Sequence, residues 1–294
     1  MTRPSVFLMA MRDQRWMVLG FGVGGALMAA LILSIYPSYS EALKDFELPP
    51  AFEAFIGDVD IASGAGFVTA EFFSWIPMLL VVYAIIQGTG VLAGEESNGT
   101  LDLLLAQPIS RTRLFLEKAT SIIVGTLAIV VLMLPGWVIP YGTVDIDVGL
   151  GRLIVATLAM APLMLAFAAL ALLAGAVLAT RRDATMAVAV LAIVSFFVNS
   201  IGQASDVLEP LRPASLFYHF HSDRIVISGV DAVGVTVLLA TAVVATGLAA
   251  LMFQRRDIGV VSGGWTKQLR QALSTVGWRR EPGGSPEDAA ARSS

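Results

Sequence analysis

Residues 153–180 read LIVATLAMAPLMLAFAALALLAGAVLAT, and these 28 residues carry no charged side chain. A helix needs about 20 apolar residues to cross the hydrocarbon core of a bilayer. Five further stretches are equally free of charge: residues 16–35, 72–93, 119–140, 184–202 and 232–253. The sequence therefore predicts an all-α integral membrane protein with six transmembrane helices.

The composition of the whole chain agrees with this interpretation. Of its 294 residues, 56% are hydrophobic and only 14% are charged, whereas soluble domains are about 25% charged. This excludes a soluble enzyme, a nucleic-acid-binding protein and a disordered scaffold. The absence of cysteine excludes disulfides, thiolate nucleophiles and cysteine-ligated metals. The first apolar stretch is longer than the core of a cleavable signal peptide, so we expect it to be retained as the first helix.

The basic residues predict the orientation of the helices. Fifteen of the 19 Lys and Arg residues lie before the first stretch, between the second and third, between the fourth and fifth, or after the sixth. Because Lys and Arg accumulate in cytoplasmic loops, we expect both termini to be cytoplasmic and the protein to be a multi-pass protein of the cell membrane.

The first outer loop has the opposite charge. Residues 36–71 contain seven acidic residues and one basic residue, Lys44. Two interpretations remain open, a solvated loop or an electronegative vestibule that attracts cations.

Proline and glycine predict local features of the helices. Pro162 lacks a backbone N–H, so it should kink or break the fourth helix. The pairs Gly20–Gly24 and Gly90–Gly94 have the spacing that lets membrane helices approach closely, and we interpret both as packing contacts.

The six stretches contain no Asp, Glu, Lys, Arg or His. Because ion relays through membranes use buried ionisable groups, ion-coupled transport is disfavoured. Gln87, Asn199 and the adjacent Gln203 are candidates for interhelical hydrogen bonds or for the lining of a pathway.

The segment after the second stretch is the most informative about function. Residues 95–111 read EESNGTLDLLLAQPISR. Thr100 can cap a short helix, in which Leu101, Leu104 and Leu105 share one face. Pro108 ends that helix, and Ser110 starts the next one. We predict a short amphipathic helix on the cytoplasmic surface.

This segment, in its place between the second and third of six spans, resembles the signature of ABC-2 type transporter permeases. The resemblance covers residues 1–258, which would form the six-helix transmembrane domain. It implies a coupling helix that docks into a separately encoded ABC ATPase. The implied docking residues are Glu95, Glu96, Gly99, Thr100, Leu101, Leu104, Pro108, Ile109 and Arg111.

The resemblance also implies a function and further elements. The chain would be the permease subunit of an ABC transporter that works as an exporter, and it would form a homodimer or a heterodimer with a second permease. Residues 5–14 correspond to an elbow helix on the inner surface, and residues 208–227 to short re-entrant outer helices.

The sequence lacks a phosphate-binding loop of the form GxxxxGK[ST]. We therefore expect no enzymatic activity and no bound cofactor in this chain, with Mg-ATP held by the partner ATPase. The sequence of residues 259–280 predicts a basic amphipathic helix that binds lipid or a partner. Residues 281–294 have the composition of a disordered tail.

The sequence leaves two other functions open. One is a membrane assembly or structural protein that does not transport. The other is an intramembrane protease. A protease of the abortive-infection type needs the motif Glu-Glu-x-x-x-Arg, but no arginine follows Glu95-Glu96 at that spacing. The two histidines, His219 and His221, lie in a predicted outer loop. A metal site is therefore not predicted, although His219 and His221 are weak candidates for ligands.

Overall fold

The computed structural model describes residues 5–43, 63–91, 110–178, 180–203, 205, 207–222 and 224–255. The chain divides into two compact units, Met1–Gln254 and Arg255–Ser294. Nearly all described residues belong to the first unit. The predicted amphipathic helix at residues 259–280 and the tail at residues 281–294 lie outside the described part of the chain.

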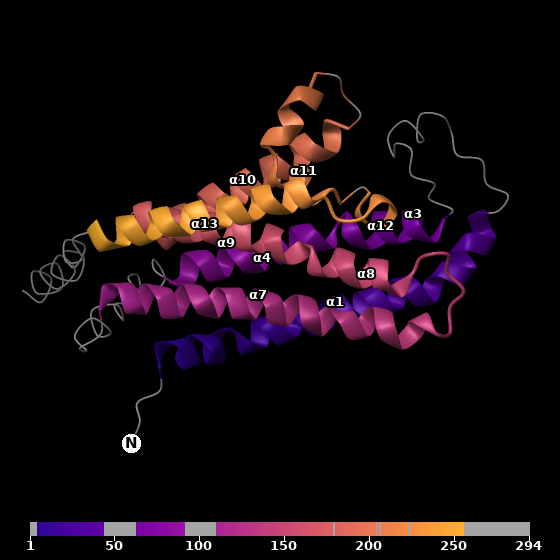
Figure 1. Cartoon of the computed structure of the whole chain (residues 1–294), viewed down its shortest axis with the longest axis horizontal. Coiled ribbons are helices and arrows are strands. Elements are labelled where there is room, and N and C mark those ends of the chain that lie inside the picture. Colours follow the sequence, from indigo (N-terminus) through magenta and orange to yellow (C-terminus); the bar gives the residue numbers. More distant parts are fainter. Residues whose placement is uncertain are drawn as a thin grey trace, which may run out of the picture. The chain divides into compact units, whose positions relative to one another are not determined.

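The described residues form helices and connections, with no strand among them. Six helices are long and apolar enough to cross a membrane, which confirms the predicted fold class (Figure 1). They are α1 (Val6–Leu43), α3 to α4 (Gly64–Val68 to Ile76–Thr89, joined by the π-helical turn η1, Thr69–Phe73), α7 (Arg111–Tyr141), α8 with α9 (Leu150–Leu158 and Met160–Val177), α10 (Arg181–Ile201) and α13 (Ala232–Arg255).

The fourth span is broken where proline predicts it. α8 ends at Leu158 and α9 begins at Met160, so the break precedes Pro162. Proline cannot donate to the carbonyl four residues earlier, which here is Leu158, and its ring clashes with that carbonyl. The predicted kink is confirmed.

Two helices extend beyond their apolar stretches. α1 runs from Val6 to Leu43 without interruption, so residues 6–14 are its first turns and the expectation of a separate elbow helix is wrong. The second span begins at Gly64, where the Ser63 hydroxyl accepts a hydrogen bond from the Gly66 N–H at 3.1 Å. Glu71 therefore lies inside a membrane-spanning helix rather than in the preceding loop.

Close backbone contacts pack the helices in two groups. α1 packs along α7, and α4 packs along α9, which α10 also contacts. A Cβ atom on Gly136 of α7 would collide with the backbone of Ala26 in α1, and one on Gly88 of α4 would collide with the backbone of Ala168 in α9. Glycine at these positions lets the helix axes approach. Phe167 and Met164 of α9 are fully buried in the resulting core.

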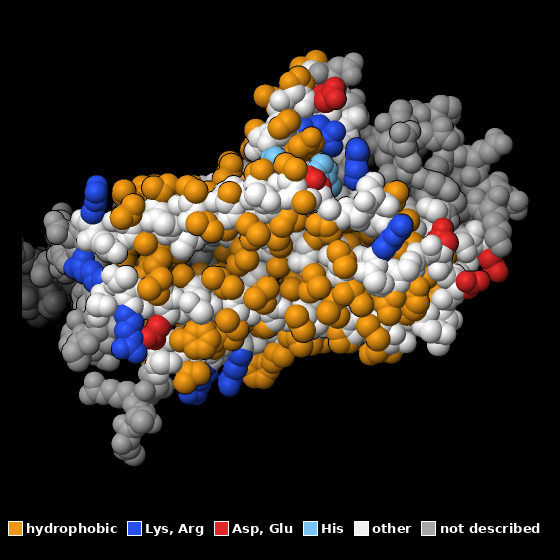
Figure 2. Space-filling model, viewed as in Figure 1, with side chains coloured by type: hydrophobic (Ala, Val, Ile, Leu, Met, Phe, Trp, Pro, Cys, Tyr) orange, Lys and Arg blue, Asp and Glu red, His pale blue; other side chains and the backbone are white. Residues whose placement is uncertain are grey.

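The last span is the least packed. α13 has the smallest buried share of the six spans, and it exposes apolar side chains such as Val233, Val243 and Val244. The view in Figure 2 shows such apolar side chains as a band along the helices, with most charged side chains toward their ends.

Three short helices precede α13: η3 (Glu209–Ala214), α11 (Leu216–Phe220) and α12 (Ile225–Ser228). Their buried side chains include Phe217, Phe220 and Val226. Ser215 fixes α11 to α10, because its hydroxyl donates to the Ser195 carbonyl oxygen at 2.7 Å. Short helices thus occur where residues 208–227 were expected to form them.

Candidate functional site

The predicted coupling segment adjoins the start of α7. Ser110 has extended backbone angles, and its hydroxyl oxygen accepts a hydrogen bond from the Arg113 N–H at 3.3 Å. Ser110 is therefore the N-cap of α7, which confirms the predicted helix start.

Arg111 is the one predicted docking residue within the described part of the chain. Glu95, Glu96, Gly99, Thr100, Leu101, Leu104, Pro108 and Ile109 lie outside the described residues. Arg111 is described, and it is the partly exposed first residue of α7. Their assignment to docking stays a prediction.

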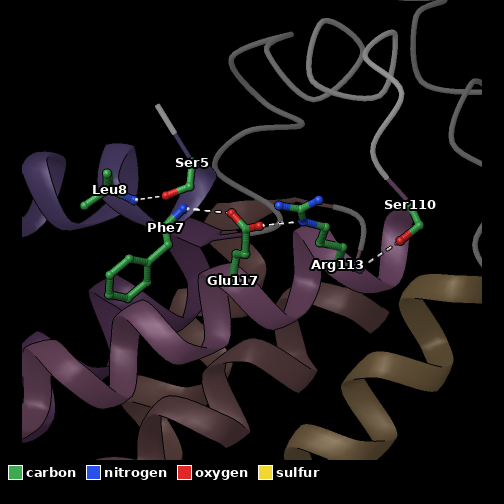
Figure 3. Close-up of polar contacts among 6 residues, drawn as sticks. All are labelled: Ser5, Phe7, Leu8, Ser110, Arg113 and Glu117. Atoms are coloured by element: carbon green, nitrogen blue, oxygen red, sulfur yellow. Dashed lines mark hydrogen bonds and ion pairs between the residues drawn. The ribbon is translucent and has the colours of Figure 1, made fainter. Parts of the chain in front are cut away.

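Glu117 joins the first turns of α1 and α7, which are far apart in the sequence (Figure 3). Its Oε2 accepts a hydrogen bond from the backbone N–H of Phe7 at 3.1 Å, and its Oε1 accepts one from Arg113 Nε at 2.8 Å. The first N–H groups of a helix lack partners within it, and a carboxylate there also complements the helix dipole. Glu117 thus fixes the end of α7 that follows the predicted coupling segment to the start of α1.

A buried polar cluster lies further along the same helices. Gln14 of α1 is 2% exposed. Its Nε2 donates to the carbonyl oxygen of Ser121 in α7 at 2.7 Å, and its Oε1 accepts from the Tyr83 hydroxyl of α4 at 3.1 Å. Gln14 precedes the first charge-free stretch, so sequence reasoning assigned it to an elbow helix on the inner surface and not to the first span. The signal that Gln14 belongs to the first span is that it continues the same helix as residues 16–35 without a break.

The helix that precedes the predicted coupling segment, α4, is attached to α10. Near the end of α4, the Thr89 hydroxyl oxygen accepts a hydrogen bond from the Thr185 hydroxyl of α10 at 3.0 Å. Residues 92–109 therefore connect a helix end attached to α10 with a helix start attached to α1.

The three predicted polar residues have different surroundings. Gln87 Nε2 donates to the Met17 sulfur of α1 at 3.3 Å, which agrees with the interhelical interpretation. Asn199 is 4% exposed, and its Oδ1 has no hydrogen-bond partner in the described structure. Gln203 is exposed beyond the end of α10.

The two histidines have separate partners. His219 Nε2 donates to the Pro213 carbonyl oxygen at 2.9 Å, and His221 Nε2 lies 3.4 Å from Asp231 Oδ2. The described residues contain no group of three or more metal-ligating side chains.

Asp231 caps the last span. Its two carboxylate oxygens accept hydrogen bonds from the backbone N–H groups of Gly234 at 2.8 Å and Val233 at 3.1 Å. These bonds, followed by the charge of a protonated His221, hold the pKa of Asp231 below its usual range.

Sequence reasoning missed Glu71 as part of the helix that forms the second candidate span. Glu71 lies in η1, the wider π-helical turn in which the Ser74 N–H donates to the Thr69 carbonyl oxygen at 3.0 Å. Such turns occur often at functional sites, and an ionisable residue in a membrane-spanning helix is itself a functional candidate. The missed signal is Ser63, which caps a run of small and apolar residues from Gly64 onward.

A comparison with protein families gives one match. The model described as "Multidrug efflux system permease Rv1217c, C-terminal domain" matches residues 4–254, which is most of the chain. None of the curated proteins compared with the chain matches it significantly.

Proposed function

The chain belongs to the family of the multidrug efflux system permease Rv1217c, C-terminal domain, and we propose that it is the membrane-spanning subunit of an ATP-driven exporter. It is a multi-pass membrane protein of a transporter permease family. The family match over residues 4–254 is the observation that carries the proposal. The finer class is the ABC-2 type, which residues 95–111 resemble.

In this proposal the energy comes from a separate ABC ATPase, which binds Mg-ATP. The permease has no phosphate-binding loop, and the family name describes a permease that is part of an efflux system. Glu95, Glu96, Leu101 and Leu104 would dock into the ATPase, while Arg111 marks the point where the coupling helix leads into α7.

The anchoring of the predicted coupling segment supports a role in transmitting force. Its preceding helix, α4, packs mainly with α9 and α10, while its following helix, α7, packs mainly with α1 and also contacts α8 and α9. A displacement of the segment would therefore act on both groups of helices. Such a movement can shift a permease between inward-open and outward-open states when ATP binding favours one of them.

We further propose that both termini are cytoplasmic and that two permease halves, identical or different, form the pathway. Arg113, Arg181 and Arg255 lie at helix ends that this orientation places on the cytoplasmic side, as the distribution of basic residues in multi-pass proteins requires.

The test is recovery of the ATPase with the affinity-tagged full chain from membranes. Glu96→Arg and Leu104→Asp should each abolish recovery of the ATPase, while the amount of chain in the membrane fraction stays unchanged. The control variant is Glu41→Arg, which makes the same charge change near the C-terminal end of α1, away from the predicted coupling segment. It should leave recovery of the ATPase unchanged. Undiminished recovery with both docking variants would contradict the proposal.

A further inference from the structure

A groove runs between α1 and the second span. Its volume is about 670 Å³, within the range of about 300–1,000 Å³ that is common for small-molecule sites. α1 contributes residues from Trp16 to Met28, and the other wall extends from Glu71 to Leu80. At about 1.5 Å per residue, these walls are roughly 14–18 Å long.

Glycine opens the floor of this groove. A Cβ atom added to Gly20 or Gly24 would meet no described atom within 4 Å, whereas one added to Gly22 or Gly25 would press against side chains of α7. The predicted packing role of the Gly20–Gly24 pair is therefore not met by any described helix of this chain. These two glycines leave space beside α1.

The groove is polar at one end. Glu71 is the only ionisable side chain among its described lining residues. In the described part of the chain no ion pair is found for its carboxylate, and the described group that interacts with its charge is the Tyr39 side chain. Charged side chains in membrane spans are costly and are usually paired or functional, so this carboxylate favours a cation as its partner.

Aromatic side chains distinguish the two ends. Trp75 lies one turn beyond Glu71, lines the groove and is 64% exposed, and an indole face attracts cations. At the other end, the guanidinium carbon of Arg15 already lies 5.3 Å from the centroid of the Trp16 ring. Arg15 repels a second cation, so a bound cation belongs at the end with Glu71 and Trp75.

We propose that this groove binds an organic monocation with an apolar body. Its charged centre contacts Glu71 and Trp75, and its apolar body lies over Gly20 and Gly24. The inference deepens the proposed permease function, on which it rests, by naming a substrate class and a site. If the same groove of a second copy faced this one, the two Glu71 carboxylates would share an interface whose lining residues include no cation.

The test uses two probes of the same shape and opposite charge, tetraphenylphosphonium and tetraphenylborate. Their binding to the full chain in nanodiscs of zwitterionic lipid is measured by equilibrium dialysis, after subtraction of binding to empty nanodiscs. We expect Glu71→Gln to weaken binding of tetraphenylphosphonium about tenfold without weakening binding of tetraphenylborate. Glu41→Gln, which removes an exposed carboxylate outside the groove, should change neither affinity.

A second variant tests the floor of the groove. Gly24→Leu places a side chain in open space, so the chain should still fold and tetraphenylphosphonium should bind at least tenfold more weakly. Equal effects of Glu71→Gln on both probes, or no saturable binding of the cation, would overturn the proposal. A change in oligomeric state with Gly24→Leu and no cation binding would assign the groove to a second copy and also overturn it. These measurements need no ATPase, so their failure leaves the docking result intact.

Discussion

The two sides of α1 use the same residue type in opposite ways. On the side toward α7, Gly22 and Gly25 contact Leu132 and Met133, and Ala26 meets Gly136. On the side toward the groove, Gly20 and Gly24 have open space beside them. Glycine spacing alone therefore does not reveal whether a membrane helix is packed or hollowed at that position; the position of the neighbouring helix decides it.

The largest expected effect comes from closing the packed side. Gly136→Ala places a Cβ atom against the backbone of Ala26, which has no flexible side chain to yield. Overpacking of this kind costs about 1–3 kcal/mol, and we expect a value near the upper end. The free energy of unfolding in mixed micelles measures it, and a loss below about 0.5 kcal/mol would contradict the close approach of α1 and α7.

A smaller effect is expected from the polar contacts of the same side. Tyr83→Phe removes the hydroxyl that donates to Gln14 Oε1 and leaves that buried acceptor unpaired. The expected loss of unfolding free energy is about 1 kcal/mol. A double-mutant cycle with Gln14→Leu should show that the two losses are not additive. Additive losses would mean that this hydrogen bond contributes nothing.

A substitution on the side of α1 toward the groove should change the free energy of unfolding in the opposite direction. Gly24→Ala adds a methyl group in free space and removes the conformational entropy penalty of glycine inside a helix, so it should stabilise the chain by about 0.5 kcal/mol. The same unfolding measurement compares it directly with Gly136→Ala. If Gly24→Ala destabilises as strongly, the two sides do not differ and the groove is closed in the protein.

The contrast extends to α13, the helix with the least packing, whose first turn depends on Asp231. Because the pKa of Asp231 is lowered in the folded state, its contribution is present above the unfolded value of about 3.9 and is lost as pH falls through the lower folded value. Wild type should therefore be slightly more stable than Asp231→Asn at pH 6, and the difference should shrink as the pH falls below about 3.9. Parallel stability curves at all pH values would contradict the role of this carboxylate.

The sequence predicts the membrane-spanning helices well because lipid selects long apolar stretches regardless of tertiary structure. It also predicts the break before Pro162 and the cap at Ser110, since both depend on local backbone chemistry. It starts the first two spans after Gln14 and Glu71, whereas the helices begin before them, because a helix continues beyond its apolar stretch as long as its backbone hydrogen bonds persist. The empty space beside Gly20 and Gly24 depends on where α7 and α4 lie, which periodicity does not encode.

The candidate site also combines local features, which the sequence predicts, with tertiary contacts, which it does not. Its flanks at Thr89 and Ser110 are defined by local contacts, and the tie from Glu117 to Phe7 needs the tertiary arrangement of α1 and α7. The docking residues themselves, from Glu95 to Ile109, rest on the resemblance of the sequence.

The most direct test of the central claim is the ATP hydrolysis rate of the ATPase that copurifies with the chain, measured with and without the chain in nanodiscs. Leu104 and Leu103 lie on different faces of the predicted coupling helix. The wild-type chain and Leu103→Asp should alter the hydrolysis rate equally, whereas Leu104→Asp should leave the ATPase at the rate it has alone. A rate with Leu104→Asp equal to that with the wild-type chain would show that residues 95–111 do not couple the permease to ATP hydrolysis.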